Sequence, residues 1–199
     1  MKQTTEAIVL GLSKHSDKIS LLHVYSRTEG RLMLQVYGAN GKKKQRAAYQ
    51  PLSLVELTYD SQPTRSVPVL STIDSVYLSE QTYNDIRRQS VALFVTEVVM
   101  LTLTHPLQDE ETYRFLVDFV HELNDTSAPE NLHITFLLRF AEYLGIGSPS
   151  SIVDEQTLTA LVSRTQRQQT LRQLCDYYLT HLDSFRLPKS LEILIEVFD

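Results

Sequence analysis

Residues 31–46 read RLMLQVYGANGKKKQR and pass from a strand-like run through a turn into a charged segment. Leu32, Leu34 and Val36 alternate with residues of mixed polarity, which is the period of a β-strand with one face in a core. The Gly-Asn-Gly turn that follows supplies residues that tolerate positive φ. Four positive charges then come within five residues. The stretch therefore predicts a strand that leads into a basic loop.

Four further runs of similar length surround this strand. They are rich in Ile, Val, Leu, Thr and Tyr and cover residues 4–12, 19–25, 52–59 and 72–78. An open sheet of five such short strands would leave exposed edges, so residues 1–79 predict a five-stranded OB-type β-barrel. Residues 61–69 contain two prolines and predict a mobile loop at the mouth of the barrel.

The hydrophobic period changes to that of helices after residue 79. Residues 84–104 predict a long helix that is apolar over much of its circumference, as at the centre of a bundle. Residues 127–145 predict a helix with Ser127 as N-cap and Gly145 at its C-terminal cap. The other expected helices cover residues 110–124, 154–164, 170–182 and 188–198. The predicted fold is therefore α+β, with a barrel domain over residues 1–79 and a bundle of about six helices over residues 80–199.

The formal net charge of −5 hides an uneven distribution along the 199 residues. Residues 1–60 hold nine Lys and Arg against five acids, and the remainder holds ten against nineteen. This asymmetry indicates a basic working face on the first domain. No apolar run approaches the roughly 18 residues that span a bilayer, and no signal peptide begins at Met1. We therefore expect a soluble, cytoplasmic protein without a membrane partner.

Residue patterns of enzymes and metal sites are missing from the sequence. Gly38 and Gly41 are separated by two residues, whereas the phosphate loop of nucleotide hydrolases needs four between its glycines. Cys175 is the only cysteine, so a multi-thiolate metal site cannot form. The six histidines include no pair at metal-binding spacing. We expect no catalytic residue, no metal and no cofactor.

The cations near the first turn and the basic loop instead indicate nucleic-acid binding. Between residues 27 and 46 six cations stand against one acid, Glu29, and such a cluster neutralises phosphates. Tyrosines beside it, Tyr25 among them, would stack on unpaired bases. The candidate binding residues are Arg27, Arg31, Lys42, Lys43, Lys44, Arg46, Tyr37 and Tyr49. The alternative interpretation is a solvated charge run with half-buried barrel tyrosines.

An ordered set of short motifs resembles the RecO family of DNA repair proteins. The N-terminal motifs are residues 6–10 (EAIVL), 24–26 (VYS), 29–31 (EGR), 38–39 (GA) and 50–52 (QPL). Later, residues 138–147 (LRFAEYLGIG) resemble the family's helix that ends in Leu-Gly, and residues 188–191 (PKSL) resemble the start of its final helix. Each motif alone is unspecific, but the ordered set spans nearly the whole chain.

The resemblance implies a recombination mediator. Such a protein binds single- and double-stranded DNA, anneals complementary strands, and acts with RecR to load the recombinase RecA onto DNA coated by single-strand-binding protein. The resemblance places the DNA contacts on the basic turn and loop, at the six cations named above. It also implies that the helical domain takes the acidic C-terminal tail of single-strand-binding protein, for which Arg139 is a weak candidate.

The chain departs from the family pattern after the Leu-Gly helix. Many members have a four-cysteine zinc site there, whereas this chain has Gly-Ser-Pro-Ser-Ser at residues 147–151. A zinc-free, compact variant is therefore expected. The alternative function is that of an interaction module, in which the OB barrel binds RNA or protein and does not anneal DNA. This alternative stays open because OB barrels serve many roles.

Overall fold

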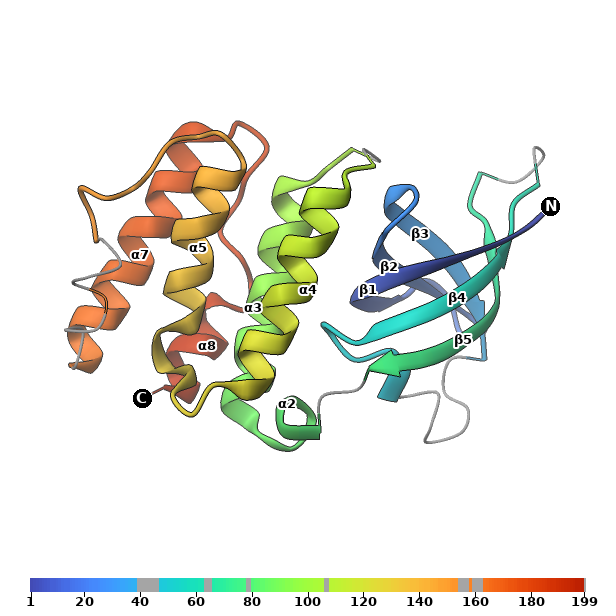
Figure 1. Ribbon diagram of the computed structural model, residues 1–199, viewed down its shortest axis with the longest axis horizontal. Helices are drawn as coiled ribbons and strands as arrows, with labels where there is room; N and C mark the ends of the chain where they lie inside the picture. The colour runs from blue at the N-terminus through green and yellow to red at the C-terminus, as the bar shows by residue number, and fades with distance from the viewer. Residues whose placement is uncertain are drawn as a thin grey trace. The chain divides into compact units, whose positions relative to one another are not determined.

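The computed structural model describes residues 1–38, 47–62, 66–77, 80–105, 108–153, 158 and 163–198. The chain forms two compact units (Figure 1). The first comprises Met1–Asn84 and Leu103–Asn124, and the second comprises Asp85–Thr102 and Asp125–Asp199. A domain boundary after residue 79 stays a prediction. None of the described helices is long and apolar enough to cross a membrane.

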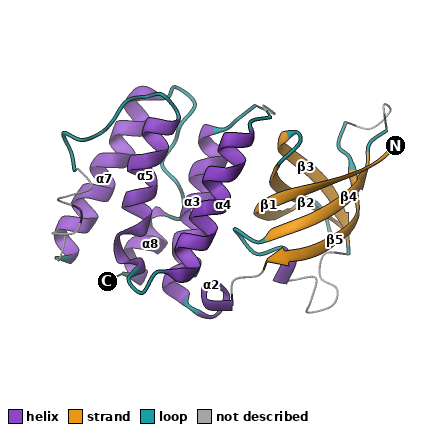
Figure 2. Ribbon diagram, viewed as in Figure 1, coloured by secondary structure: helices purple, strands orange, loops and turns teal. Residues whose placement is uncertain are grey.

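Five strands in the first unit close into a barrel, drawn in orange in Figure 2. They are β1 (Lys2–Lys14), β2 (Ile19–Ser26), β3 (Gly30–Tyr37), β4 (Leu54–Asp60) and β5 (Val69–Tyr77). The order around the barrel is β1-β2-β3-β5-β4. Neighbours are antiparallel except β3 and β5, which form a parallel pair where Gln35 lies opposite Val69. The predicted five-stranded OB-type barrel is confirmed.

The alternation predicted for residues 31–37 fixes which side chains fill the barrel. Leu34 and Val36 are buried in the core, and Leu32 packs against it. The same cluster includes Leu22 and Val24 from β2, together with residues from β1 and β4. The residues between them, on β2 and β3, therefore point out of the barrel.

Two turn residues explain where the strands begin. Gly30 has φ +69 and opens β3, as its position in a tight turn requires. Leu52 has φ +63, a left-handed conformation that a leucine adopts only at some cost. The strand predicted from residue 52 consequently starts at Leu54. Of the predicted loop at residues 61–69, residues 63–65 lie outside the described part, and Val69 already belongs to β5.

Helix α4 (Glu110–Asp125) belongs for nearly all of its length to the first unit. Its N-terminus is capped by Asp109, whose carboxylate accepts the backbone N–H groups of Glu111 and Thr112 at 3.1 Å each. One face of the helix is buried, including Tyr113, Leu116, Val120 and Leu123. The same unit contains the short helix α2 (Glu80–Asn84), which the sequence pattern did not predict.

The second unit is helical. Its elements are α3 (Ile86–Thr102), the 3₁₀ turn η1 (Pro129–Asn131), α5 (Leu132–Tyr143), α7 (Arg164–His181) and α8 (Leu191–Val197). α5 packs against α3 and α7, and α3 packs against α8. Glu97 on α3 accepts the backbone N–H groups of Lys189 and Ser190 at 2.8 Å each, which ties the start of α8 to α3.

Local chemistry explains two departures from the predicted helices and one agreement with them. Ser127 is not an N-cap, because residues 129–131 form a 3₁₀ turn before α5 begins. Gly145, with φ +71, does end α5: its N–H donates to Glu142, and that of Ile146 to Ala141. α7 starts six residues earlier than predicted, because the Ser163 hydroxyl caps it by accepting Gln166 N–H. The helix predicted at residues 154–164 lies mostly outside the described residues.

Candidate nucleic-acid interface

The outward side chains of β2 and β3 form one surface, which we call the β2–β3 outer face. Register pairs place His23 opposite Met33, and Tyr25 opposite Arg31. The residues of this face are Ile19, Leu21, His23 and the buried Tyr25 on β2, and Arg31, Met33, Gln35 and Tyr37 on β3, and none of them is a carboxylate. Met33 is 37% exposed and Tyr37 is 59% exposed. An exposed aromatic ring on the same strand as a cation can stack on an unpaired base while the cation contacts phosphate.

Arg31 is half-buried and lacks a carboxylate partner. Its Nη1 atom is buried and has no hydrogen-bond partner, and Arg31 forms no ion pair within the described part of the chain. Burial lowers the pKa of its guanidinium, which nevertheless remains charged at neutral pH. A half-buried guanidinium with an unused donor is stabilised by an anion that supplies oxygen acceptors. Arg31 therefore has the properties of a phosphate contact.

Tyr37 ends β3 at the point where the chain turns toward the basic loop. Gly38 follows with φ +66, and nothing lies within 4 Å of the position that a Cβ would take. The predicted contacts Lys42, Lys43, Lys44 and Arg46 lie outside the described residues. The exposed Tyr37 ring directly precedes these cations in the sequence, so it could stack on a base whose phosphate the cations contact.

The other two tyrosines near the cations are buried. Tyr49 is 8% exposed and belongs to the barrel core, and Tyr25 is 2% exposed. Burial raises the pKa of both hydroxyls. Neither ring offers a face to a base in this conformation, so stacking on Tyr49 stays a prediction that would require the ring to leave the core.

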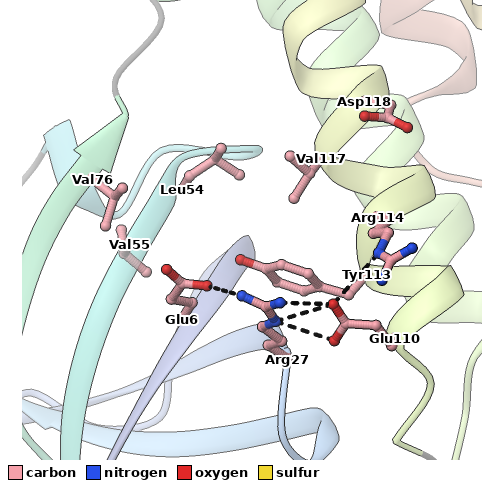
Figure 3. Close-up of a pocket in the computed structure, with 10 residues that line it drawn as sticks. All are labelled: Glu6, Arg27, Leu54, Val55, Val76, Glu110, Tyr113, Arg114, Val117 and Asp118. Atoms are coloured by element: carbon pink, nitrogen blue, oxygen red, sulfur yellow. Dashed lines mark hydrogen bonds and ion pairs between the residues drawn. The ribbon is translucent and has the colours of Figure 1, made fainter.

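Arg27 is held by two carboxylates of the first unit (Figure 3). Its Nη2 donates to Glu110 at 2.9 Å, its Nε donates to both oxygens of the same carboxylate, and its Nη1 donates to Glu6 at 2.8 Å. The hydrogen bonds that Arg27 donates to Glu110 and then to Glu6 raise the pKa of its guanidinium. Arg27 also lies over the Tyr113 ring, 5.8 Å from its centroid. These groups border a cavity of about 290 Å³ with an apolar wall.

Arg27 therefore differs from Arg31 in its readiness to bind a phosphate. A phosphate would have to displace Glu110 and Glu6 from the Arg27 guanidinium, whereas Arg31 has no carboxylate partner among the described residues. The sequence indicated both cations but not their partners. Glu110 lies 83 residues from Arg27, and no local pattern reveals so distant a contact.

The outer face of β1, β4 and β5 is acidic. Glu6 lies opposite Glu56, and Glu56 lies opposite Asp74, so three carboxylates form a row across three strands. Like charges in direct register destabilise a sheet slightly and repel an approaching polyanion. The barrel therefore has a row of three carboxylates on β1, β4 and β5, of which Glu6 is paired with Arg27, and an outer face without acids on β2 and β3.

The remaining predicted contact is in the second unit. Arg139 lies on α5 and is exposed. Among the described residues, no group of three or more His, Cys, Asp or Glu side chains is arranged to hold a metal ion. Sequence analysis did not single out His23, although the alternation of β2 places it on the same side as Leu21 and Tyr25.

Two family models match the chain. Residues 1–78 match "Recombination protein O N terminal", and residues 83–150 match "Recombination protein O C terminal". The chain is 25% identical, over an alignment of 237 positions, to the DNA repair protein RecO of Flavobacterium psychrophilum, with all of both chains covered. It is 26% identical, over an alignment of 241 positions, to that of Porphyromonas gingivalis, with 98% of each chain covered.

Proposed function

This chain belongs to the RecO family, and from that membership we propose that it is a non-catalytic DNA repair protein that binds single- and double-stranded DNA through its barrel. It anneals complementary strands and, with RecR, helps to load the recombinase RecA onto DNA coated by single-strand-binding protein. The observation that supports DNA binding most directly is the β2–β3 outer face, which combines the unpaired Arg31 with the exposed Met33 and Tyr37.

Binding follows from charge neutralisation and stacking. Arg31 and the cations of the basic loop hold phosphates, and each neutralised phosphate releases condensed counterions. Tyr37 stacks on bases without regard to their identity, because every base has a π-face. Contacts of this kind carry no sequence information. A strand held in this way remains able to shift its register against a complementary strand, which annealing requires.

The helical unit is the proposed partner surface. An acidic tail is bound most readily by a surface that carries cations. Arg139 is one candidate. A second is the small cavity of the second unit, where Arg164 and Arg167 lie beside apolar side chains, namely Leu171, Leu194, Ile195 and Phe198.

A salt titration of DNA binding tests the proposal. For single-stranded oligonucleotides, the logarithm of the binding constant should fall linearly with the logarithm of salt concentration, by about 0.7 per contacted phosphate. Double-stranded DNA should show a similar dependence, and the purified protein should accelerate annealing of complementary strands. Binding that does not respond to salt, or an annealing rate no higher than without protein, would contradict the proposal.

The alternative is an interaction module that binds RNA or a protein instead. Competition between labelled single-stranded DNA and structured RNA separates the two functions. We expect unlabelled single-stranded DNA to displace the probe at lower concentration than structured RNA of equal length. Stronger competition by RNA, without annealing of DNA, would favour the interaction module.

Removing one of the two carboxylates that hold Arg27 should strengthen DNA binding. In Glu110→Gln the Arg27 guanidinium keeps only Glu6 as a charged partner, so its charge is more available to phosphate, and we expect about threefold higher affinity. The thermal midpoint of unfolding should fall, because the contact between α4 and the barrel strands weakens. Glu111→Gln is the matched control, since Glu111 is exposed and the charge change is identical. Equal affinities in the two variants would restrict Arg27 to a structural role.

A further inference from the structure

His23 and Arg31 lie diagonally across the β2–β3 pair on the same outer face. His23 is opposite Met33, and Arg31 is two residues from Met33 along β3. Side chains at such diagonal positions have Cβ atoms about 7–8 Å apart, a separation that long side chains bridge. One phosphate group placed between them can contact both the guanidinium and the imidazole.

The hydrogen bonds of His23 leave one ring nitrogen for a ligand. Its Nε2 lies 3.1 Å from the Ser13 hydroxyl, which itself lies 3.5 Å from the carbonyl oxygen of Leu21. Ser13 can therefore donate to Leu21 while it accepts the Nε2–H of His23. Within the described residues, His23 Nδ1 has no hydrogen-bond partner. Protonation at Nδ1 would create a second N–H donor on the outer face.

The surroundings of His23 keep it neutral in the free protein. Burial and then the charge of Arg31 lower its pKa from the ordinary value of 6.5. Ser13 faces it from β1, and Met33 and Arg31 face it from β3, so no carboxylate among these neighbours stabilises the imidazolium. On β2 the neighbouring Tyr25 hydroxyl is directed to Thr112 and Asp109 instead. An anion beside Arg31 would reverse this balance, because it attracts the imidazolium.

We propose that His23 and Arg31 together hold one phosphate of bound DNA, and that His23 takes up a proton from solvent at Nδ1 as the phosphate binds. The phosphate accepts hydrogen bonds from the Arg31 guanidinium and from the new His23 Nδ1–H. This inference rests on the proposed DNA-binding function and adds a pH dependence to it. Because the bound form has more protons than the free form, affinity rises as the pH falls.

Binding of oligothymidylate at constant ionic strength between pH 7.5 and pH 5.5 tests the inference, since thymine does not titrate in this range. We expect affinity to rise about threefold or more, since each unit of pKa shift on binding allows up to a tenfold change. His23→Gln should abolish most of this rise. His15→Gln is the control, because His15 is exposed on the turn between β1 and β2, and the rise should persist. Arg31→Gln should lower affinity at every pH.

Two further measurements separate failure of this inference from failure of DNA binding. If the parent and His23→Gln bind DNA with the same pH dependence, the inference is overturned and the proposed function stands. If neither binds DNA, the proposed function fails, and the His23 imidazole signals followed by NMR with sulfate as the probe decide the anion site. A sulfate-induced increase in the pKa of His23 in the parent, absent in Arg31→Gln, supports the site. An unchanged pKa in the parent overturns it.

Discussion

Replacing Lys42, Lys43 and Lys44 together by Glu lowers the affinity for single-stranded oligonucleotides at moderate salt by at least about tenfold, because three phosphate contacts become three repulsions. The salt dependence should weaken too. Because three fewer phosphates are neutralised, the slope of the logarithm of affinity against the logarithm of salt concentration falls by about 2 for single strands. Fluorescence anisotropy with a labelled oligonucleotide at several salt concentrations measures both quantities.

The control for this variant needs the same change in net charge at another place. Arg172, Arg186 and Lys189 are exposed residues of the second unit, and their replacement by Glu matches the change. Of these three side chains, Arg172 has an ion pair within the described part of the chain, with Glu192 at 3.1 Å. An ion pair that is this exposed to solvent contributes little to stability. We expect the control to bind within about twofold of the parent. Equal losses in both variants would mean that total charge, and not the basic loop, determines affinity.

The barrel could be predicted because its signal is local. The alternation of Leu32, Leu34 and Val36 marks which face of β3 is buried, and the five strands leave few compact arrangements. The pairing of β3 with β5 could not be predicted, since it joins Gln35 to Val69 across the loop and β4. The late start of β4 was also unpredictable, because a leucine with positive φ contradicts local preference.

Most helices of the chain could be predicted from the sequence, but the residues at which they begin and end could be predicted less well. The apolar circumference of residues 84–104 indicated a buried helix, and α3 buries residues on most of its sides. Thr96 is buried there because its hydroxyl donates to the carbonyl oxygens of Ala92 and Leu93. The start of α7 was missed because the residues after Ser163 are polar, and the hydrophobic period begins only near Thr170.

The candidate site shows what a list of cations omits. By sequence Arg27 and Arg31 have equal weight, yet the structure pairs one with two carboxylates and leaves the other without any described partner. That difference depends on the position of α4 in the first unit and on strand register. The register between β2 and β3 also brings His23 close to Arg31. The residue pattern of one strand does not reveal its register with the next. The sequence therefore shows that each arginine is present, whereas the fold determines which carboxylates neutralise it.

A buried histidine in the second unit should make its stability depend strongly on pH. His133 on α5 is 3% exposed, and its Nδ1 is buried without a hydrogen-bond partner. Its ring lies between those of Phe94 and Phe198, with centroids at 6.3 and 5.6 Å. Burial, and then the charge of Arg167, lower its pKa from 6.5 to about 3. The folded state therefore holds this side chain neutral.

The sign of the pH effect follows from these two pKa values. Below pH 6.5 the unfolded chain binds a proton at His133, whereas the folded chain does not. The contribution of neutral His133 to the free energy of unfolding is therefore fully present above pH 6.5 and is lost progressively as the pH falls toward about 3. Between pH 7 and pH 5 the loss from this one residue is about 2 kcal/mol, at about 1.4 kcal/mol per pH unit below 6.5. Urea unfolding followed by far-ultraviolet circular dichroism at pH 5, 6 and 7 measures it.

The decisive comparison is with His133→Phe, which keeps an aromatic ring against Phe94 and Phe198 and cannot be charged. Between pH 7 and pH 5, we expect the free energy of unfolding of this variant to fall by about 2 kcal/mol less than that of the parent. The substitution removes no hydrogen bond at Nδ1, because that atom has no partner. His181→Gln, at an exposed histidine of α7, should retain the parental pH dependence. If the parent and His133→Phe lose the same free energy of unfolding over this interval, the buried neutral histidine is not the group that limits stability in acid.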